Sequence, residues 1–152
     1  MTHDILHPSG WKATPGYANG IAASGRMVFT GGVVGWNAQQ EFESDDFADQ
    51  VETALRNIVA ILAEGGAGPE DLVRLTWYVT DKQEYLASLK QIGQAYREVI
   101  GRTYPAMAMV QVVALIEDRA KVEIEATAVI SDRTGRRDGG RKEPLGGLIR
   151  RL

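Results

Sequence analysis

The sequence predicts an α+β fold in which two helices pack on one face of a mixed β-sheet. Segments with strand and helix patterns follow one another in the order strand, strand, helix, strand, helix, strand, strand. Both helical segments carry an apolar stripe, so both need a surface to cover. The length of 152 residues, with 44% hydrophobic and 24% charged residues, suits one globular domain, which we place at residues 1–130.

The first two predicted strands cover residues 21–24 and 27–34, and the intervening Gly25-Arg26 suits a tight hairpin. Gly31-Gly32 inside the second strand is unusual, because glycine there costs backbone entropy and buries no side chain. Such a pair usually marks a bulge or the close approach of a ligand or of a neighbouring backbone.

The strongest predicted helix follows, with Ser44 or Asp45 as its N-cap and Gly65-Gly66 as its end. Its apolar residues recur at helical spacing: Phe47, Val51, Ala54, Leu55, Ile58, Ile61 and Leu62. A turn at residues 69–71 leads into a predicted strand at residues 72–79.

A second helix is predicted over residues 85–100, although Gly93 weakens it by ~1 kcal/mol. The last two strands are predicted over residues 109–115 and 121–130, joined by a charged turn at Glu117-Asp118-Arg119. Because both helices would cover the same face of the sheet, the other face would be bare in a monomer. The fold therefore predicts oligomerisation.

Strand alternation places Lys121, Glu123 and Glu125 on one face of the last strand. The apolar residues of the same strand fall on the other face: Val122, Ile124, Ala126 and Ala128. A solvated sheet face explains the three charges simply. The alternative is that one of the carboxylates lines a cleft.

Composition excludes several kinds of site. Cys is absent, which excludes disulfides, thiolate zinc sites and a catalytic Cys. The histidines, His3 and His7, both lie near the N-terminus, so we expect neither a Ser-His-Asp arrangement nor any metal or other cofactor. No apolar run approaches the ~20 residues needed to cross a bilayer, and we expect a cytoplasmic protein without membrane contact.

Charge is distributed unevenly along the chain. Residues 131–152 hold seven basic and three acidic residues and so carry a net charge of +4. Because the whole chain has a net charge of −3, residues 1–130 carry a net charge of −7. The terminal segment is also rich in Gly and lacks periodicity, so we predict a flexible basic tail. Because acidic residues lie among the basic residues of this tail, it is not expected to bind nucleic acid.

Several short motifs carry a resemblance to a known family. They occur in this order: Gly16-Tyr17, Val28-Phe29-Thr30-Gly31-Gly32, Gln50 with Ala54-Leu55-Arg56-Asn57-Ile58, Thr76-Trp77-Tyr78-Val79-Thr80-Asp81, Tyr104-Pro105-Ala106 and Val122-Glu123-Ile124-Glu125-Ala126. Together they resemble the RidA (YjgF) superfamily of small enamine and imine deaminases, over residues 15–130. The resemblance implies a chorismate-mutase-like homotrimer with substrate clefts between subunits.

The chain departs from the family pattern where it matters for substrate binding. Deaminating members carry Pro-Ala-Arg-Ser, and their arginine clamps the carboxylate of the imino acid, whereas this chain has Met107 at the arginine position. A thioether offers only dispersion and a weak acceptor. Leu89 likewise stands where many members have asparagine. Arg102 and Arg26 are candidates to replace the missing cation.

Glu123 is the candidate catalytic residue, since the resemblance implies a glutamate there that positions water beside the imine carbon. The alternative is an ion pair with Lys121 or Arg119.

The candidate substrate-binding residues are Tyr17 at the cleft mouth, Thr30 and Gly31 as polar contacts, and Met107 and Met109 as an apolar wall. Four of the five have a simpler structural explanation: turn packing for Tyr17, strand propensity for Thr30, and core filling for the two methionines.

Two functions fit these observations. The first is an enamine or imine hydrolase acting on a small reactive metabolite less polar than 2-aminoacrylate. The second is a non-catalytic homotrimer that binds a small hydrophobic molecule or a protein in the same clefts. A third possibility is the ribonuclease activity that is associated with the family. It fits poorly, because residues 1–130 carry a net negative charge and no catalytic His is expected.

Overall fold

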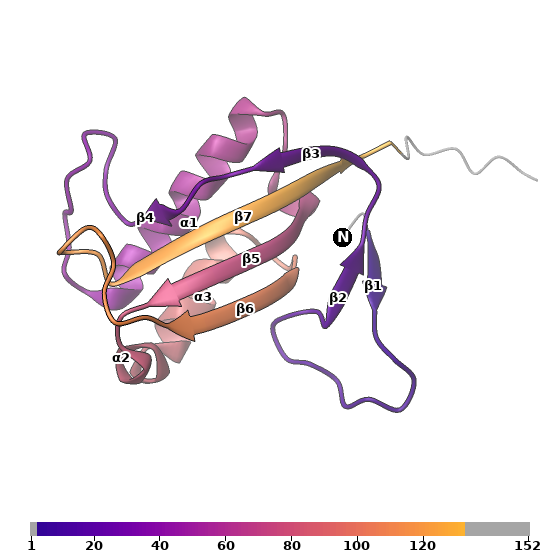
Figure 1. Cartoon of the computed structure of the whole chain (residues 1–152), viewed down its shortest axis with the longest axis horizontal. Helices are drawn as coiled ribbons and strands as arrows, with labels where there is room; N and C mark the ends of the chain where they lie inside the picture. Colours follow the sequence, from indigo (N-terminus) through magenta and orange to yellow (C-terminus); the bar gives the residue numbers. More distant parts are fainter. Residues whose placement is uncertain (1–2, 133–152) are drawn as a thin grey trace, which may run out of the picture.

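The computed structural model describes residues 3–132, and its main sheet has the strand order β3-β7-β5-β6. These strands are β3 (Gly25–Phe29), β7 (Val122–Ser131), β5 (Leu72–Val79) and β6 (Ala106–Gln111), and the short β4 (Val33–Val34) also pairs with β7 (Figure 1). All pairs are antiparallel except β5 with β6, which is parallel. The predicted mixed sheet and the α+β class are therefore confirmed.

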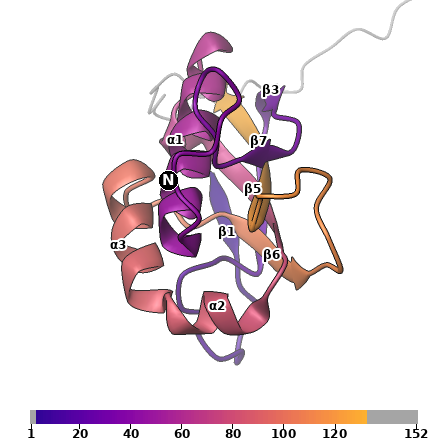
Figure 2. The ribbon, with the colours of Figure 1, turned by 90° about the vertical axis from the view of Figure 1, so that its left-hand side faces the viewer.

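Three helices lie together on one side of this sheet, as Figure 2 shows. They are α1 (Phe47–Glu64), α2 (Lys82–Ala87) and α3 (Leu89–Val99), and a short 3-10 helix, η1 (Pro69–Asp71), precedes β5. The second predicted helix is thus two helices that meet at Ser88. Between residues 3 and 132, no helix is both long and apolar enough to span a membrane.

Helix α1 begins at Phe47, and its N-cap is Asp46 rather than the predicted Ser44 or Asp45. The Asp46 side chain accepts a hydrogen bond from the Asp49 amide, while the Ser44 hydroxyl accepts from the Asp46 amide. The helix ends at Gly65, and Gly66 follows with a φ of +77°, a left-handed conformation that glycine adopts freely. The predicted end of this helix is confirmed.

The predicted hairpin around Gly25-Arg26 is wrong. Strand β2 (Gly20–Ala22) pairs instead with β1 (Asp4–Leu6) in a separate two-stranded sheet, and β3 pairs with β7 at the far end of the chain. Gly25 has a φ of +147°, and a Cβ there would overlap the Ile130 carbonyl. Glycine at this position therefore permits a long-range strand contact rather than a local turn.

The last two strands differ from the prediction in their bounds and are not neighbours in the sheet. The strand expected at residues 109–115 ends at Gln111, and β5 lies between β6 and β7, which are not neighbours. Because β5 and β6 are parallel, the chain must cross over between them, and α2 and α3 form that crossover. The segment 112–121 then returns the chain to the centre of the sheet.

The two faces of the sheet differ as predicted from β7. Val122, Ile124, Ala126 and Ala128 are buried against the helices. Glu123 is half-buried and Glu125 is exposed on the other face. That open face, which in the described part of the chain no helix covers, also carries the exposed side chains of Met27 and Phe29 on β3 and Val110 on β6.

The basic tail predicted from residue 131 lies outside the described residues from residue 133 onward. Ser131 is the last residue of β7.

Candidate functional site

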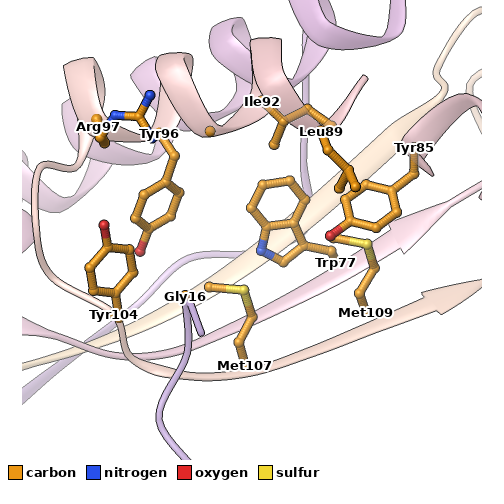
Figure 3. A pocket seen from close by; sticks show the side chains of 11 residues that line it. Gly16, Trp77, Tyr85, Leu89, Ile92, Tyr96, Arg97, Tyr104, Met107 and Met109 are labelled. Carbon is orange, nitrogen blue, oxygen red and sulfur yellow. The ribbon is translucent and has the colours of Figure 1, made fainter. Parts of the chain in front are cut away.

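An apolar pocket lies between α3 and the edge strand β6, on the helix-covered side of the sheet. Its volume is about 240 Å³. The lining residues, shown in Figure 3, are Gly16, Trp77, Tyr85, Leu89, Ile92, Gly93, Tyr96, Arg97, Tyr104, Met107 and Met109. Apolar pockets with a few polar groups at the edge of a sheet are typical small-molecule sites.

Strand register places the two methionines in this pocket. Met107 pairs with Leu75 and Met109 pairs with Trp77 in the parallel ladder, so both methionines share the face of those buried core residues. Both are half-buried and pack against the core. Met107, at the family's arginine position, and Met109, which the sequence suggested as an apolar wall, therefore line a pocket.

Gly16 reaches the pocket because the segment before it is attached to β6. The Ala18 amide donates to the Pro105 carbonyl at 3.0 Å, and Ala18 bridges Ala106 in parallel. Gly16 has a φ of +74°, which turns the chain without a side chain. Tyr17, next to it, is 42% exposed and lines a neighbouring hollow of about 430 Å³.

The hollow beside Tyr17 and the pocket under α3 share two lining residues, Gly16 and Tyr104. Arg102 lines only the hollow, and Arg26 lies elsewhere, where its guanidinium donates to the Gly65 carbonyl. Neither of the two arginines proposed from the sequence therefore lines the pocket of the methionines.

Four aromatic side chains that carry a polar atom line the methionine pocket: Trp77, Tyr85, Tyr96 and Tyr104. The Tyr96 hydroxyl donates to the Thr103 carbonyl at 2.5 Å, and the Tyr96 ring stacks on Tyr104 with centroids 5.7 Å apart. Burial raises the pKa of Tyr96, so its hydroxyl stays neutral at physiological pH. Trp77 is only 2% exposed, and its buried Nε1 has no hydrogen-bond partner in the part of the chain that the structure describes.

Glu123 lies on the open face of the sheet, opposite the face that carries the pocket. It pairs with Tyr78 of β5 and with Val34 of β4 across the ladders. Its carboxylate occupies the space beside Gly32, where a Cβ would come within 1.8 Å of Oε1. The close approach at Gly32 is therefore made by the Glu123 side chain, and not by the ligand or neighbouring backbone expected from the sequence.

Thr30 holds the chain to β7 at the same place. Its amide donates to the Ala126 carbonyl at 2.9 Å, and its hydroxyl accepts from the Ala126 amide at 3.0 Å. The hydroxyl also donates to the Gly31 carbonyl at 2.8 Å, so its hydrogen and one of its two lone pairs are used within the chain. At Gly31, by contrast, a Cβ would meet no atom within 4 Å.

The neighbouring carboxylate, Glu125, is engaged on the same open face. It accepts a hydrogen bond from the Tyr78 hydroxyl at 2.9 Å, and this bond raises the pKa of Tyr78. Among residues 3–132 there is no group of three or more His, Asp or Glu side chains arranged to hold a metal ion.

Within one chain the candidate residues therefore form two sets. Met107 and Met109 lie in the pocket, with Tyr17 beside it, while Glu123, Thr30 and Gly31 lie together on the open face. The thickness of the sheet separates the two sets.

Sequence reasoning missed several residues of the pocket, chiefly Arg97, Tyr104 and the indole nitrogen of Trp77. Arg97 could have been found, because Leu89, Gly93 and Arg97 recur at intervals of four and so share one face of a helix. The unpartnered indole could not have been found, since it depends on which atoms surround Trp77.

Comparison with known proteins adds a family. A family model described as Endoribonuclease L-PSP matches residues 9–130. The 2-iminobutanoate/2-iminopropanoate deaminase of Escherichia coli (strain K12) is 32% identical over 129 residues, which are 85% of this chain and 98% of that protein.

Two solved structures share the fold. The Rid family protein YyfB from Yersinia pestis has a TM-score of 0.76 at 30% identity, and the match covers 86% of this chain and all of that chain. E. coli TdcF with bound serine has a TM-score of 0.60 at 32% identity, and the match covers 84% of this chain and 99% of that one.

Proposed function

The chain belongs to the RidA (YjgF) superfamily, and we propose that it is an enamine or imine hydrolase for a small reactive metabolite less polar than 2-aminoacrylate. A relative that the match covers over 98% of its length is named as a deaminase of two imino acids. The observation that carries the proposal is the apolar pocket built on Met107 and Met109, at the position where the family resemblance implies an arginine.

The proposed reaction needs a positioned water and a proton donor. Water adds across the C=N bond to give a carbinolamine, whose C–N bond then breaks, releasing ammonia and leaving a carbonyl compound. Glu123 would take a proton from the attacking water and return it to the leaving nitrogen. Its place beside Gly32 supports this role, because a substrate atom can approach the backbone at the adjacent Gly31, where a Cβ would meet no atom within 4 Å.

The proposal requires more than one copy of the chain. Glu123 and the methionine pocket lie on opposite faces of one sheet, so a single subunit does not bring them together. A homotrimer in which the open face of one copy meets the pocket edge of the next would do so. The exposed apolar residues Met27, Phe29 and Val110 on the open face support such an association.

The five proposed binding residues have different parts in this model. Met107 and Met109 would contact the apolar body of the substrate, Tyr17 would cover the entrance, and the backbone at Gly31 would approach the reacting end. Thr30 would act through its backbone hydrogen bonds rather than as a substrate ligand, because its hydroxyl is used within the chain.

Ammonia release from freshly generated imino acids tests the proposal. An amino acid oxidase acting on leucine or alanine supplies imines with a large or a small side chain. We expect faster hydrolysis of the leucine-derived imine, and a loss of about 100-fold in Glu123→Gln. Glu125→Gln is the matched control on the same strand and face. Hydrolysis of 2-aminoacrylate that matches arginine-bearing relatives would contradict the proposal.

The alternative is a non-catalytic trimer that binds a small apolar molecule. The dispersive lining of the pocket favours it, and E. coli TdcF binds serine, so ligand occupancy has a precedent among relatives. Binding that persists in Glu123→Gln, with no imine consumed by the unmodified protein, would support this alternative.

The proposal names no cofactor, and its partners are a small molecule and further copies of the chain. RNA is not among them despite the name of the family model, because residues 1–130 carry a net charge of −7. RNA binding at low salt that disappears as salt is raised would argue against this point. A cytoplasmic location, expected from the sequence, belongs to the same proposal.

A further inference from the structure

The pocket under α3 contains a buried hydrogen-bond donor that has no acceptor within the chain. The Trp77 side chain is 2% exposed, and its Nε1 finds no partner in residues 3–132. Buried donors of this kind are rarely left unpaired, because the donor loses its hydrogen bond to water on burial and no other hydrogen bond compensates for that loss. In Figure 3 the indole nitrogen faces the space between Met107 and the Tyr96–Tyr104 pair. An acceptor atom therefore belongs in that space.

The pocket contains further hydrogen-bond donors. The Arg97 guanidinium can only donate, and the hydroxyls of Tyr85 and Tyr104 can donate or accept. Among the described residues, the lining contains no Asp, Glu, Asn or Gln. A ligand that satisfies this set must supply acceptors, and one acceptor should be an anion because the set includes a guanidinium.

Arg97 is available for an anion. It is exposed at the pocket, and the part of the chain that the structure describes gives it no ion pair or hydrogen bond. Figure 3 places Arg97 and Tyr104 at one end of the pocket and Tyr85, Leu89 and Met109 at the other. The pocket is therefore cationic at one end, apolar at the other, and has the Trp77 donor between the two ends.

We propose that this pocket binds 2-imino acids, and the 2-oxo acids formed from them, that carry a branched or aromatic side chain. The carboxylate lies at Arg97 and Tyr104, the atom on C2 accepts from Trp77 Nε1, and the side chain contacts Leu89, Ile92 and Met109. Arg97 on α3 then takes the place of the arginine that the family carries on the strand at Met107. This inference rests on the proposed hydrolase function and names its substrate class.

Size supports a bulky side chain. The pocket of about 240 Å³ holds roughly eight water volumes at ~30 Å³ each. A three-carbon imino acid would leave the end at Leu89 and Met109 empty, and its side chain would gain no contact there. A branched or aromatic side chain fills that end with the dispersive contacts that a thioether favours.

The indole N–H signals of the protein test the inference directly. The chain has three tryptophans, so a ¹H–¹⁵N spectrum has three indole signals. Trp11→Phe and Trp36→Phe assign two of them, which identifies the Trp77 signal without altering Trp77. We expect 4-methyl-2-oxopentanoate to shift that signal, and pyruvate to bind at least about tenfold more weakly.

Charge replacement tests the anion end. Arg97→Gln should weaken 4-methyl-2-oxopentanoate about tenfold and leave the neutral ketone 4-methylpentan-2-one unchanged. Arg102→Gln is the matched control, because Arg102 lines the neighbouring hollow and not this pocket. Equal weakening by the two substitutions would overturn the assignment of Arg97, as would a Trp77 signal that no 2-oxo acid shifts.

Failure of the inference and failure of the proposed hydrolase can be distinguished. A shifted Trp77 signal without any ammonia release from the leucine-derived imine supports the pocket assignment and contradicts the hydrolase. Ammonia release while the Trp77 signal stays unchanged at saturating 4-methyl-2-oxopentanoate overturns the inference and leaves the hydrolase standing.

Discussion

The two faces of the central sheet differ in how completely the chain covers them. On the helix-covered face, Ile124 of β7 is fully buried among residues of α1, α3 and β5. On the open face, Phe29 is 63% exposed and Met27 is 55% exposed, although both side chains are large and apolar. Within residues 3–132, the chain itself covers the helix-covered face. The open face exposes apolar side chains of the kind that usually lie in protein interfaces.

This difference separates stability from assembly. Burial on the helix-covered face removes apolar area from water inside one subunit, so it stabilises the monomer. The open face gains the same benefit only on association. Substitutions that change one face at a time sharpen this contrast, and their expected effects decrease from a fully buried core residue to a single hydroxyl group.

The largest effect is expected for Ile124→Ala. Ile124 has no exposed surface, and its truncation should lower the free energy of unfolding by about 2–5 kcal/mol because a cavity replaces well-packed atoms. Glu125→Ala, one residue along the strand, removes only an exposed hydrogen bond with Tyr78 and should change stability by about 0.5 kcal/mol. Urea unfolding of both variants measures the contrast. Similar losses for the two would mean that the faces do not differ in this way.

The second effect concerns association. Phe29→Lys places a charge on the open face and should raise the dissociation constant of the proposed trimer by about 100-fold or more, because the ammonium would have to be desolvated. Ile61→Lys is the matched control, since Ile61 is 43% exposed on α1. Sedimentation velocity at several protein concentrations gives the masses. A trimer of unchanged strength in Phe29→Lys would show that this face is not the interface.

The helix-covered face was also the more predictable one. The strand at residues 72–79, the end of the first helix and the alternation along β7 all follow from local periodicity, and the structure agrees with each. The errors lie where distant segments pair. Gly25 joins β3 to β7 rather than closing a local hairpin, because the backbone approaches Ile130 from the other end of the chain.

The candidate site could be predicted only in part for a similar reason. The motif residues are present, and register explains why Met107 faces a pocket. The sequence did not indicate that Glu123 and Met107 lie on opposite faces, because their strands are separated by β5. Nor did it indicate that Arg97 rather than Arg102 lines the pocket, which depends on how α3 packs over the edge strand.

A smaller effect is expected for Tyr96→Phe, which removes the hydrogen bond to the Thr103 carbonyl on the helix-covered side. At neutral pH the unpaired carbonyl should cost about 1–2 kcal/mol. Burial raises the pKa of Tyr96 above that of the unfolded chain, so its neutral form favours the fold below about pH 10, and this contribution is lost as pH rises further.

The variant should therefore lose stability less steeply than the unmodified protein above about pH 10, by up to ~1.4 kcal/mol per pH unit. Tyr104→Phe, at the partner ring of the stacked pair, is the control. Thermal unfolding followed between pH 8 and pH 11 supplies the measurement. Parallel curves for Tyr96→Phe and the unmodified protein would contradict the assignment.

The smallest effect is expected at Thr30, where the chain passes from β3 towards β4 beside the open face. Thr30→Val keeps the shape of the side chain but removes the acceptor of the Ala126 amide, which should cost about 1 kcal/mol of stability. Thr30→Ser retains the hydroxyl and should restore most of that loss. Because the hydroxyl already bonds Ala126 and Gly31, Thr30→Ser should leave KM for the leucine-derived imine unchanged. If Thr30→Val strongly raises KM for the leucine-derived imine while the free energy of unfolding falls by only about 1 kcal/mol, the hydroxyl contacts the substrate. The functional role of the open face would then include Thr30.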